Sequence, residues 1–73
     1  MTLKQIQYAL MIAQCGSISK AASILFVSTP TLSEAICNLE EEIGFPLFIR
    51  SHSGMSVSRE GKRFLEDAGN IMQ

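Results

Sequence analysis

Apolar residues recur at helical spacing in the first part of the chain, over residues 3–14. One face of this helix is defined by a stripe of four residues, Leu3, Ile6, Leu10 and Ala13. Further apolar side chains lie off the stripe, so the pattern predicts a helix that packs on more than one side. Gly16 follows the segment, and a glycine is a common end signal for a helix.

Two more helices are predicted directly after the first one. A short helix covers residues 20–25, and either Ser17 or Ser19 can serve as its N-cap. A longer helix covers residues 30–43 and has one apolar stripe, formed by Leu32, Ile36, Leu39 and Ile43. A short helix, a tight turn and a second helix are the parts of a helix-turn-helix motif.

The start of the longer helix is marked by a proline. Pro30 suits the first turn, because the N–H that it lacks would be unpaired there in any helix. The residue before a proline avoids the helical region, so the sequence predicts Thr29 as the N-cap. The end of this helix is predicted at Gly44.

A small hairpin and a last helix are predicted in the remainder of the chain. Residues 46–50 and 55–57 have the pattern of short strands, and residues 51–54 have the composition of a turn. Ser58 is the expected cap of the last helix. The apolar stripe of that helix is still running where the chain stops, and it comprises Phe64, Leu65, Ala68, Ile71 and Met72.

The order of these elements predicts a mostly α fold, the winged helix-turn-helix, with a three-helix core, a two-stranded wing and the start of a further C-terminal helix. The expected division is residues 1–58 for the winged domain and residues 59–73 for the start of a dimerisation helix. One domain of 73 residues is marginally stable alone. A second copy is therefore favoured as the cover of the last apolar stripe, and the alternative is that this stripe belongs to the domain's own core.

Composition disfavours several classes of protein. The apolar fraction of 47% is ordinary for a globular domain. No apolar run reaches the length of a membrane span, and the first residues do not resemble a secretion signal, so we expect a cytoplasmic protein without a membrane partner. Cys15, Cys37 and His52 form no pattern typical of a metal site, a disulfide framework or a nucleophile with its base. An enzyme is therefore disfavoured, and no cofactor is expected.

The distribution of charge is more informative than the net charge of −1. Four basic residues stand against Glu60 alone in one stretch of the C-terminal half, and they are Arg50, Arg59, Lys62 and Arg63. Such a local excess fits a surface that faces phosphates, and it fits an ordinary solvated surface about as well. The acidic run at residues 40–42 is interpreted as a solvated helix face that lies away from nucleic acid.

Several motifs, taken in order, resemble the N-terminal domain of LysR-type transcriptional regulators. The matching segments are residues 16–22 (GSISKAA), 27–33 (VSTPTLS), 39–48 (LEEEIGFPLF) and 58–61 (SREG). The resemblance implies a regulator that binds double-stranded DNA as a homodimer, paired through the linker helix, and that activates or represses transcription. It also implies an effector domain that is absent from this chain, and a small-molecule inducer that acts only through that domain.

The same resemblance implies which residues contact DNA and which pair the subunits. The start of the third helix contributes Ser28, Thr29, Pro30, Thr31, Ser33 and Glu34. The wing contributes Arg50, Ser51, His52 and Ser53. Dimerisation is assigned to the stripe Phe64, Leu65, Ala68, Ile71 and Met72. Taken alone, Ser28, Thr29 and Ser33 could simply cap and solvate a helix, but the order of the elements favours DNA contact.

Some positions depart from the family pattern. Thr29 stands where the family often has glutamine, and Ser51 and His52 stand where more basic residues are frequent. Glu34 stands where a basic or amide side chain is common. Its carboxylate would be repelled by phosphates, or it would accept a hydrogen bond from cytosine N4, and both alternatives remain open.

A protein-interaction module is the alternative function. Winged helices also bind proteins through the same face, and the acidic balance together with Glu34 would suit that role. The affinity for DNA and its dependence on salt distinguish the two functions.

Overall fold

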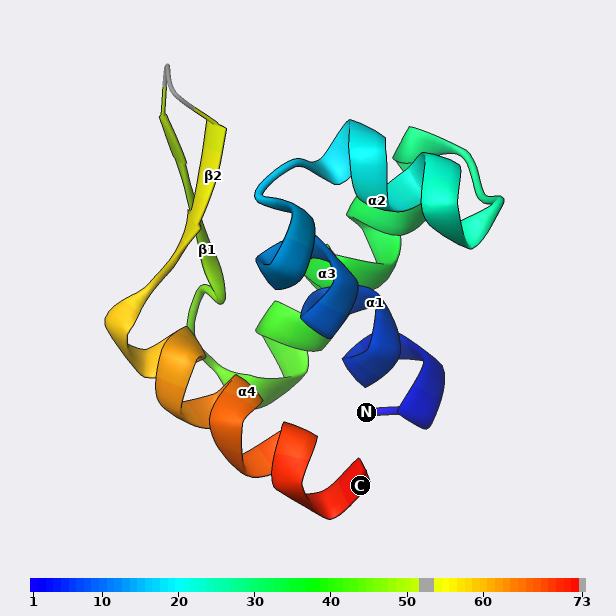
Figure 1. Cartoon of the computed structure of the whole chain (residues 1–73). Helices are drawn as coiled ribbons and strands as arrows, with labels where there is room; N and C mark the ends of the chain where they lie inside the picture. Colours follow the sequence, from blue (N-terminus) through cyan, green and yellow to red (C-terminus); the bar gives the residue numbers. More distant parts are fainter. Residues whose placement is uncertain (52–53, 73) are drawn as a thin grey trace.

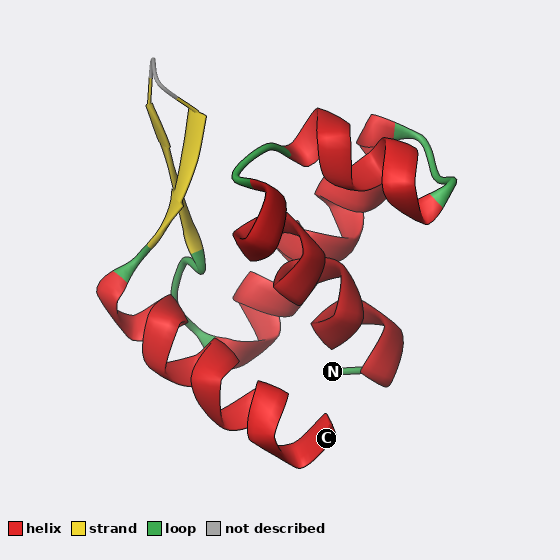
Figure 2. Cartoon of the chain, viewed as in Figure 1, coloured by secondary structure: helices red, strands yellow, loops and turns green. Residues whose placement is uncertain are grey.

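The computed structural model describes residues 1–51 and 54–72, and in this part of the chain four helices surround one core while a hairpin projects from one side (Figure 1). The elements follow in the order α1 (Leu3–Cys15), α2 (Ile18–Leu25), α3 (Thr29–Ile43), β1 (Phe48–Ser51), β2 (Gly54–Val57) and α4 (Arg59–Met72). Helix is the main secondary structure, and the two strands form one antiparallel pair (Figure 2). The predicted winged helix-turn-helix fold is therefore confirmed.

The core is formed by one buried face from each helix and by the residues that lead into the wing. Helix α3 contributes three residues of its predicted stripe, Leu32, Ile36 and Leu39. Helix α2 contributes Ala21 and Ala22, whose small side chains allow it to pack closely against its neighbours. Leu47 and Phe48 close the core on the side of the hairpin, and Leu65 and Ala68 close it on the side of α4.

Helix α1 occupies the centre of the domain and contacts all three other helices and β2. Its buried residues are Ala9 and Ile12, whereas Leu3 is 61% exposed. The stripe predicted through Leu3 is therefore wrong as the buried face, and Leu10 and Ala13 are only partly buried beside the core. A helix with neighbours on several sides is apolar around most of its circumference, so spacing alone could not select the face.

Side-chain caps define where the helices begin. Ser17 is the N-cap of α2, since its hydroxyl accepts from the Lys20 N–H at 3.3 Å, which decides between the two candidates. The cap of α3 is Ser28 and not the predicted Thr29, which is already the first helical residue. The hydroxyl of Ser28 accepts from the N–H of Thr31 at 3.2 Å. A cap at Thr29 would need a later amide, and the next one already donates to the Ser28 carbonyl.

The wing is shorter at its start than the sequence predicts. Strand β1 begins at Phe48 and not at residue 46, and its register with β2 runs from Phe48 opposite Val57 to Ser51 opposite Gly54. Leu47 lies just before the strand: its carbonyl accepts from the Ser58 N–H at 2.9 Å, while its own N–H donates to a side chain of α3. The alternation of apolar residues could not show that this N–H has a partner outside the hairpin.

Helix α4 leaves the wing without a linker and packs directly against the segment before β1. Ser58 caps it as predicted, because its hydroxyl accepts from the Gly61 N–H at 2.9 Å and donates to the Pro46 carbonyl at 2.6 Å. A Cβ on Gly61 would lie 2.5 Å from the Leu47 carbonyl oxygen, so a side chain at this position would push α4 off the domain. Within the described ranges, no helix is both long and apolar enough to cross a membrane.

Candidate nucleic-acid interface

The start of α3 is an exposed polar end. Ser28, Thr29, Pro30 and Thr31 are all exposed. The Ser28 hydroxyl donates to the Thr31 hydroxyl at 2.7 Å and accepts from the Thr31 N–H, so both side chains are partly committed to the cap. Since Pro30 has no N–H and Thr31 donates to Ser28, Thr29 keeps the amide best placed for a phosphate at this helix end. The cap therefore uses one of the N–H donors at this helix end.

One turn further along α3, two neighbouring residues lie on different faces of the helix, one exposed to solvent and one directed toward the wing. Glu34 is exposed and continues the side that begins at Thr31. Ser33 is half-buried and points toward the hairpin. These two residues of the predicted site thus have different surroundings, although they are neighbours in sequence.

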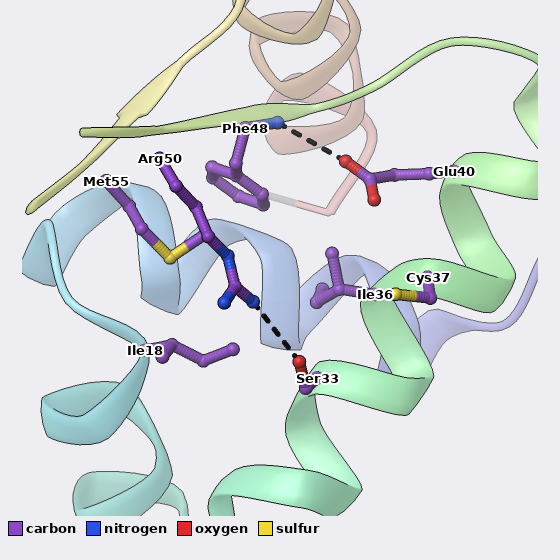
Figure 3. A pocket seen from close by; sticks show the side chains of 8 residues that line it. All are labelled: Ile18, Ser33, Ile36, Cys37, Glu40, Phe48, Arg50 and Met55. Atoms are coloured by element: carbon purple, nitrogen blue, oxygen red, sulfur yellow. Dashed lines mark hydrogen bonds between the residues drawn. The ribbon is translucent and has the colours of Figure 1, made fainter.

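Arg50 connects the wing to α3. Its side chain extends from β1 across a shallow pocket, and its Nη2 donates to the Ser33 Oγ at 3.3 Å (Figure 3). The floor of the pocket is apolar and includes Ile36, Phe48 and Met55. The aliphatic stem of Arg50 can cover these groups while the guanidinium stays at the surface. The structure therefore brings the wing arginine and the predicted helix residue Ser33 together.

The remaining wing residues are placed only in part. Ser51 is exposed at the end of β1, and its hydroxyl donates to the Gly54 carbonyl at 3.1 Å. His52 and Ser53, which were also predicted to contact DNA, lie outside the described residues.

A second hollow lies between the wing and the start of α2. It is lined by Ser17, Ile18, Arg50 and Met55, among others. The Met55 N–H donates to the Gly16 carbonyl at 3.3 Å, which fixes β2 against the turn between α1 and α2. The first turn of α2 was not predicted beside the wing, because the contact joins segments that are far apart in the sequence.

Glu40 is a candidate functional residue whose surroundings differ from those predicted. It was expected on a solvated acidic face, but it is half-buried, and its Oε2 accepts from the Leu47 N–H at 2.6 Å and from the Phe48 N–H at 3.4 Å. Glu41 and Glu42 are exposed, as expected for the rest of the run, and Glu42 pairs with the amino group of Met1. A signal was present in the sequence: Glu40 follows the buried Ile36 by four residues and so borders the apolar stripe.

The predicted dimerisation stripe on α4 is divided by the fold. Leu65 and Ala68 are buried in the core of this same chain, which agrees with the alternative that part of the stripe is intradomain. Phe64 is only half-buried, and its ring meets Phe45 edge to face, with ring centroids 6.2 Å apart and planes at 77°. The side chains of Ile71 and Met72 lie outside the described residues.

Three of the six lysines and arginines lie together at the start of α4, and the other three are on separate elements. Arg50 is at the wing, while Arg59, Lys62 and Arg63 are all exposed along the first turns of α4. Lys20 adds a further exposed cation on α2. Among the described side chains, no group of three or more acidic, histidine or cysteine residues is arranged to hold a metal ion.

Comparison with protein families gives a match over most of the chain. Residues 3–62 match the family described as "Bacterial regulatory helix-turn-helix protein, lysR family". A relative from Bacillus subtilis, the uncharacterized HTH-type transcriptional regulator YcgK, is 41% identical over 73 residues, which are all of this chain and 22% of the relative. The HTH-type transcriptional regulator ClcR of Pseudomonas putida is 36% identical over 72 residues, covering 99% of this chain and 24% of ClcR. The chain thus spans less than a quarter of the length of these relatives, which are transcriptional regulators and not enzymes.

Solved structures with 33–36% sequence identity have the same fold as this chain. The LysR family regulator CbnR superposes with a TM-score of 0.93 at 36% identity, over 99% of this chain and 25% of CbnR. The DNA-binding domain of CbnR in complex with DNA gives the same score and identity over 83% of that domain. The BenM domain bound to catB site 1 DNA gives 0.93 at 33% identity over 81% of its length. With its fold and its sequence both matched over nearly its whole length, the chain belongs to the lysR family of bacterial regulatory helix-turn-helix proteins.

Proposed function

We propose that this chain binds double-stranded DNA sequence-specifically, with the start of α3 in the major groove and the wing against the sugar–phosphate backbone. The observation that carries the proposal is the single exposed surface on which the start of α3 and Arg50 meet, joined by the contact between Arg50 and Ser33. The match over 99% of the chain to domains solved in complex with DNA supports the binding of DNA.

Different residues of this surface have different roles in the proposal. Thr29 and Thr31 are exposed at the tip of α3, where short hydroxyl side chains can reach base edges or phosphates. Ser28 supports the tip as its cap. Arg50 supplies a phosphate contact from the wing, and a basic side chain in that role adds salt-dependent affinity without sequence information.

Glu34 determines how selective the surface is. It is exposed on the same side of α3 as Thr31. A carboxylate in the major groove accepts from cytosine N4, and a well-made contact of this kind discriminates by roughly 1–3 kcal/mol. We therefore propose that Glu34 reads a base and that its negative charge lowers the non-specific affinity of the chain for DNA.

We further propose that two copies act together on DNA, paired through α4. Phe64 is the described residue of the predicted stripe that remains half-exposed, and it lines an open hollow together with Phe45. A two-fold symmetric pair would read a roughly palindromic site with half-sites about one helical turn apart, or a multiple of it. In this proposal a separate effector domain responds to any small molecule, and this chain is the DNA-binding domain of the regulator.

The proposal is tested by selection from a random pool of DNA duplexes at moderate salt, followed by sequencing of the retained duplexes. A symmetric motif with turn-spaced halves is the expected result. Retention without an enriched motif would reduce the proposal to backbone binding. Sedimentation equilibrium of the chain with and without the recovered duplex tests the pairing, and a protein that stays monomeric on DNA would contradict it.

A protein-interaction module remains the second candidate, because one exposed apolar residue favours it. Phe26, in the turn between α2 and α3, is 94% exposed, and Ile24 beside it is 51% exposed. Exposed aromatic side chains are enriched at protein interfaces. If the duplex pool yields nothing, including with a longer chain that carries more of α4, this second function gains the support.

A further inference from the structure

We infer that Glu40 is a positioning residue for DNA binding: its carboxylate fixes the direction in which the wing projects from the recognition helix α3. This inference rests on the proposed function, since it concerns how the wing reaches the DNA backbone. Glu40 itself is not placed at the DNA. It acts through the wing that it holds.

The carboxylate of Glu40 is hydrogen-bonded to the backbone at the start of the hairpin. The Oε2 atom of Glu40 accepts from the N–H of Leu47 at 2.6 Å. It also accepts from the N–H of Phe48 at 3.4 Å, and this second bond is drawn in Figure 3. These two amides lie at the point where the chain enters β1. Hydrogen bonds to an ionised acceptor are stronger than neutral ones. The two bonds to Glu40 hold the first residues of the hairpin, where a small change of direction would move the whole hairpin.

The pairing of the strands explains why this edge needs an outside acceptor. Leu47 and Ser58 occupy the position of a hydrogen-bonded pair, in which the Ser58 N–H donates to the Leu47 carbonyl, while the Leu47 N–H donates to Glu40 instead of to Ser58. Pairs alternate along an antiparallel ladder, so the next one, Phe48 opposite Val57, is a non-hydrogen-bonded pair. The N–H of Phe48 therefore points away from β2, toward α3, where Glu40 meets it.

The opposite edge of the hairpin is attached in the same manner. Met55 opposes Arg50 in a non-hydrogen-bonded pair, and its outward N–H donates to the Gly16 carbonyl at 3.3 Å. A two-stranded hairpin is marginally stable at best when isolated. The direction of this one is thus set by its contacts on both edges, and Glu40 supplies the charged contact.

Helix α3 places the anchor and the proposed DNA-contacting residues on one rigid element. Ser33 and Glu40 are two helical turns apart on the face toward the wing, and they contact Arg50 and the start of β1 respectively. The exposed residues Thr31 and Glu34 lie on another side of the same helix. A shift at Glu40 would therefore move Arg50 relative to the groove without changing the side chains that read bases.

The decisive variant is Glu40→Asp, which keeps the charge but shortens the side chain by one methylene. Residual dipolar couplings of the backbone amides measure the angle between the hairpin and α3. The slope of log affinity against log salt, measured with a random-sequence 30-base-pair duplex, reports the number of phosphate contacts. We expect Glu40→Asp to change the angle, to speed amide exchange at Leu47 and Phe48, and to lower the slope by about one unit.

Two further variants separate positioning from general stability. Glu40→Gln keeps the length and an acceptor oxygen, so we expect the wild-type angle and slope to return, after correction for the lost charge. Glu41→Asp and Glu41→Gln are the matched controls, because Glu41 is the exposed neighbour on the same helix. Should Glu40→Asp keep the wild-type angle and slope, or Glu40→Gln behave like Glu40→Asp, the inference would be overturned.

The design also keeps the inference distinct from the proposed function. If the wild-type chain binds no duplex at all, the proposed function fails, and the angle between wing and α3 in the free protein still decides whether Glu40 sets it. If the wild type binds DNA and only the angle is insensitive to Glu40, the positioning role is refuted while the proposed function stands.

Discussion

The guanidinium of Arg50 lies 3.3 Å from the hydroxyl of Ser33, so the side chain of Arg50 joins the wing to α3. Arg50 reaches this position across an apolar pocket, and its location is therefore fixed by packing as well as by the hydrogen bond. An arginine held in one place loses less conformational entropy when it binds a phosphate than a freely rotating one.

Replacing Arg50 by alanine should weaken DNA binding at every sequence alike. One phosphate contact contributes about 0.9 to the slope of log affinity against log salt on duplex DNA, so the slope should fall by about that amount. Fluorescence anisotropy with a random-sequence duplex at several salt concentrations measures it. Lys4→Ala is the control of equal charge, since α1 begins at the opposite end of the domain from the wing (Figure 1). An equal loss in both variants would show that Arg50 acts only through net charge.

Replacing Glu34 by arginine should strengthen binding to a random-sequence duplex and steepen its salt dependence, because a repelled carboxylate is exchanged for an attracted cation. Glu34→Gln separates the charge from the hydrogen bond. If Glu34 reads a cytosine, selection with the glutamine variant should lose or change the preference at one position of each half-site, at roughly 1–3 kcal/mol. Unchanged affinity and unchanged preference in both variants would place Glu34 away from the DNA.

Two glycines of α4 should respond to alanine in opposite directions. At Gly61 a Cβ would come within 2.5 Å of the Leu47 carbonyl oxygen, which is backbone and cannot turn aside, so Gly61→Ala should destabilise the fold by about 1–3 kcal/mol. At Gly69 a Cβ meets nothing within 4 Å, so Gly69→Ala should stabilise it by up to about 1 kcal/mol through helix propensity. Urea denaturation of both variants measures the free energies of unfolding. The same sign for both would contradict the packing described for α4.

Phe26 should tolerate replacement by asparagine with a gain in stability. It ends α2 in the left-handed conformation, with φ at 58°, which a bulky side chain adopts at a cost and asparagine adopts more readily. Since its ring is 94% exposed, removing the ring sacrifices little packing. We expect a rise in Tm that corresponds to roughly 0.5–1 kcal/mol, measured by circular dichroism. A fall in Tm would mean that the ring has contacts that the exposed fraction does not reveal.

The sequence predicted the order of the elements because each boundary carries a local signal. Gly16 and Gly44 end helices in the left-handed conformation, and Ser17 and Ser58 cap the helices that follow them. The cap of α3 was assigned one residue too late, because the restriction on a residue before proline was given more weight than the reach of the Ser28 hydroxyl. Signals of this kind fix an element to within one or two residues and say little about its neighbours.

The candidate site was predictable only where its chemistry is local. The exposed tip of α3 follows from the cap and the proline, whereas the role of Glu40 depends on amides seven and eight residues further along the chain. Read as a sequence, Glu40 is one of three consecutive acids, and only its spacing of four residues from Ile36 distinguishes it from Glu41. The buried face of α1 was not predicted for the same reason. Ala9 is buried because of how the other elements surround α1, and the spacing of apolar residues does not single it out.

The close contact between Gly61 and the Leu47 carbonyl has a mechanical consequence. The joint between the winged domain and α4 contains no free residue that could act as a hinge, because Ser58 caps the helix and Gly61 rests on the backbone before β1. In a pair of chains joined through α4, a rotation of one helix against the other would turn each recognition helix by a similar angle. The crossing angle of the two α4 helices would then determine the distance between the two half-sites that the pair can span.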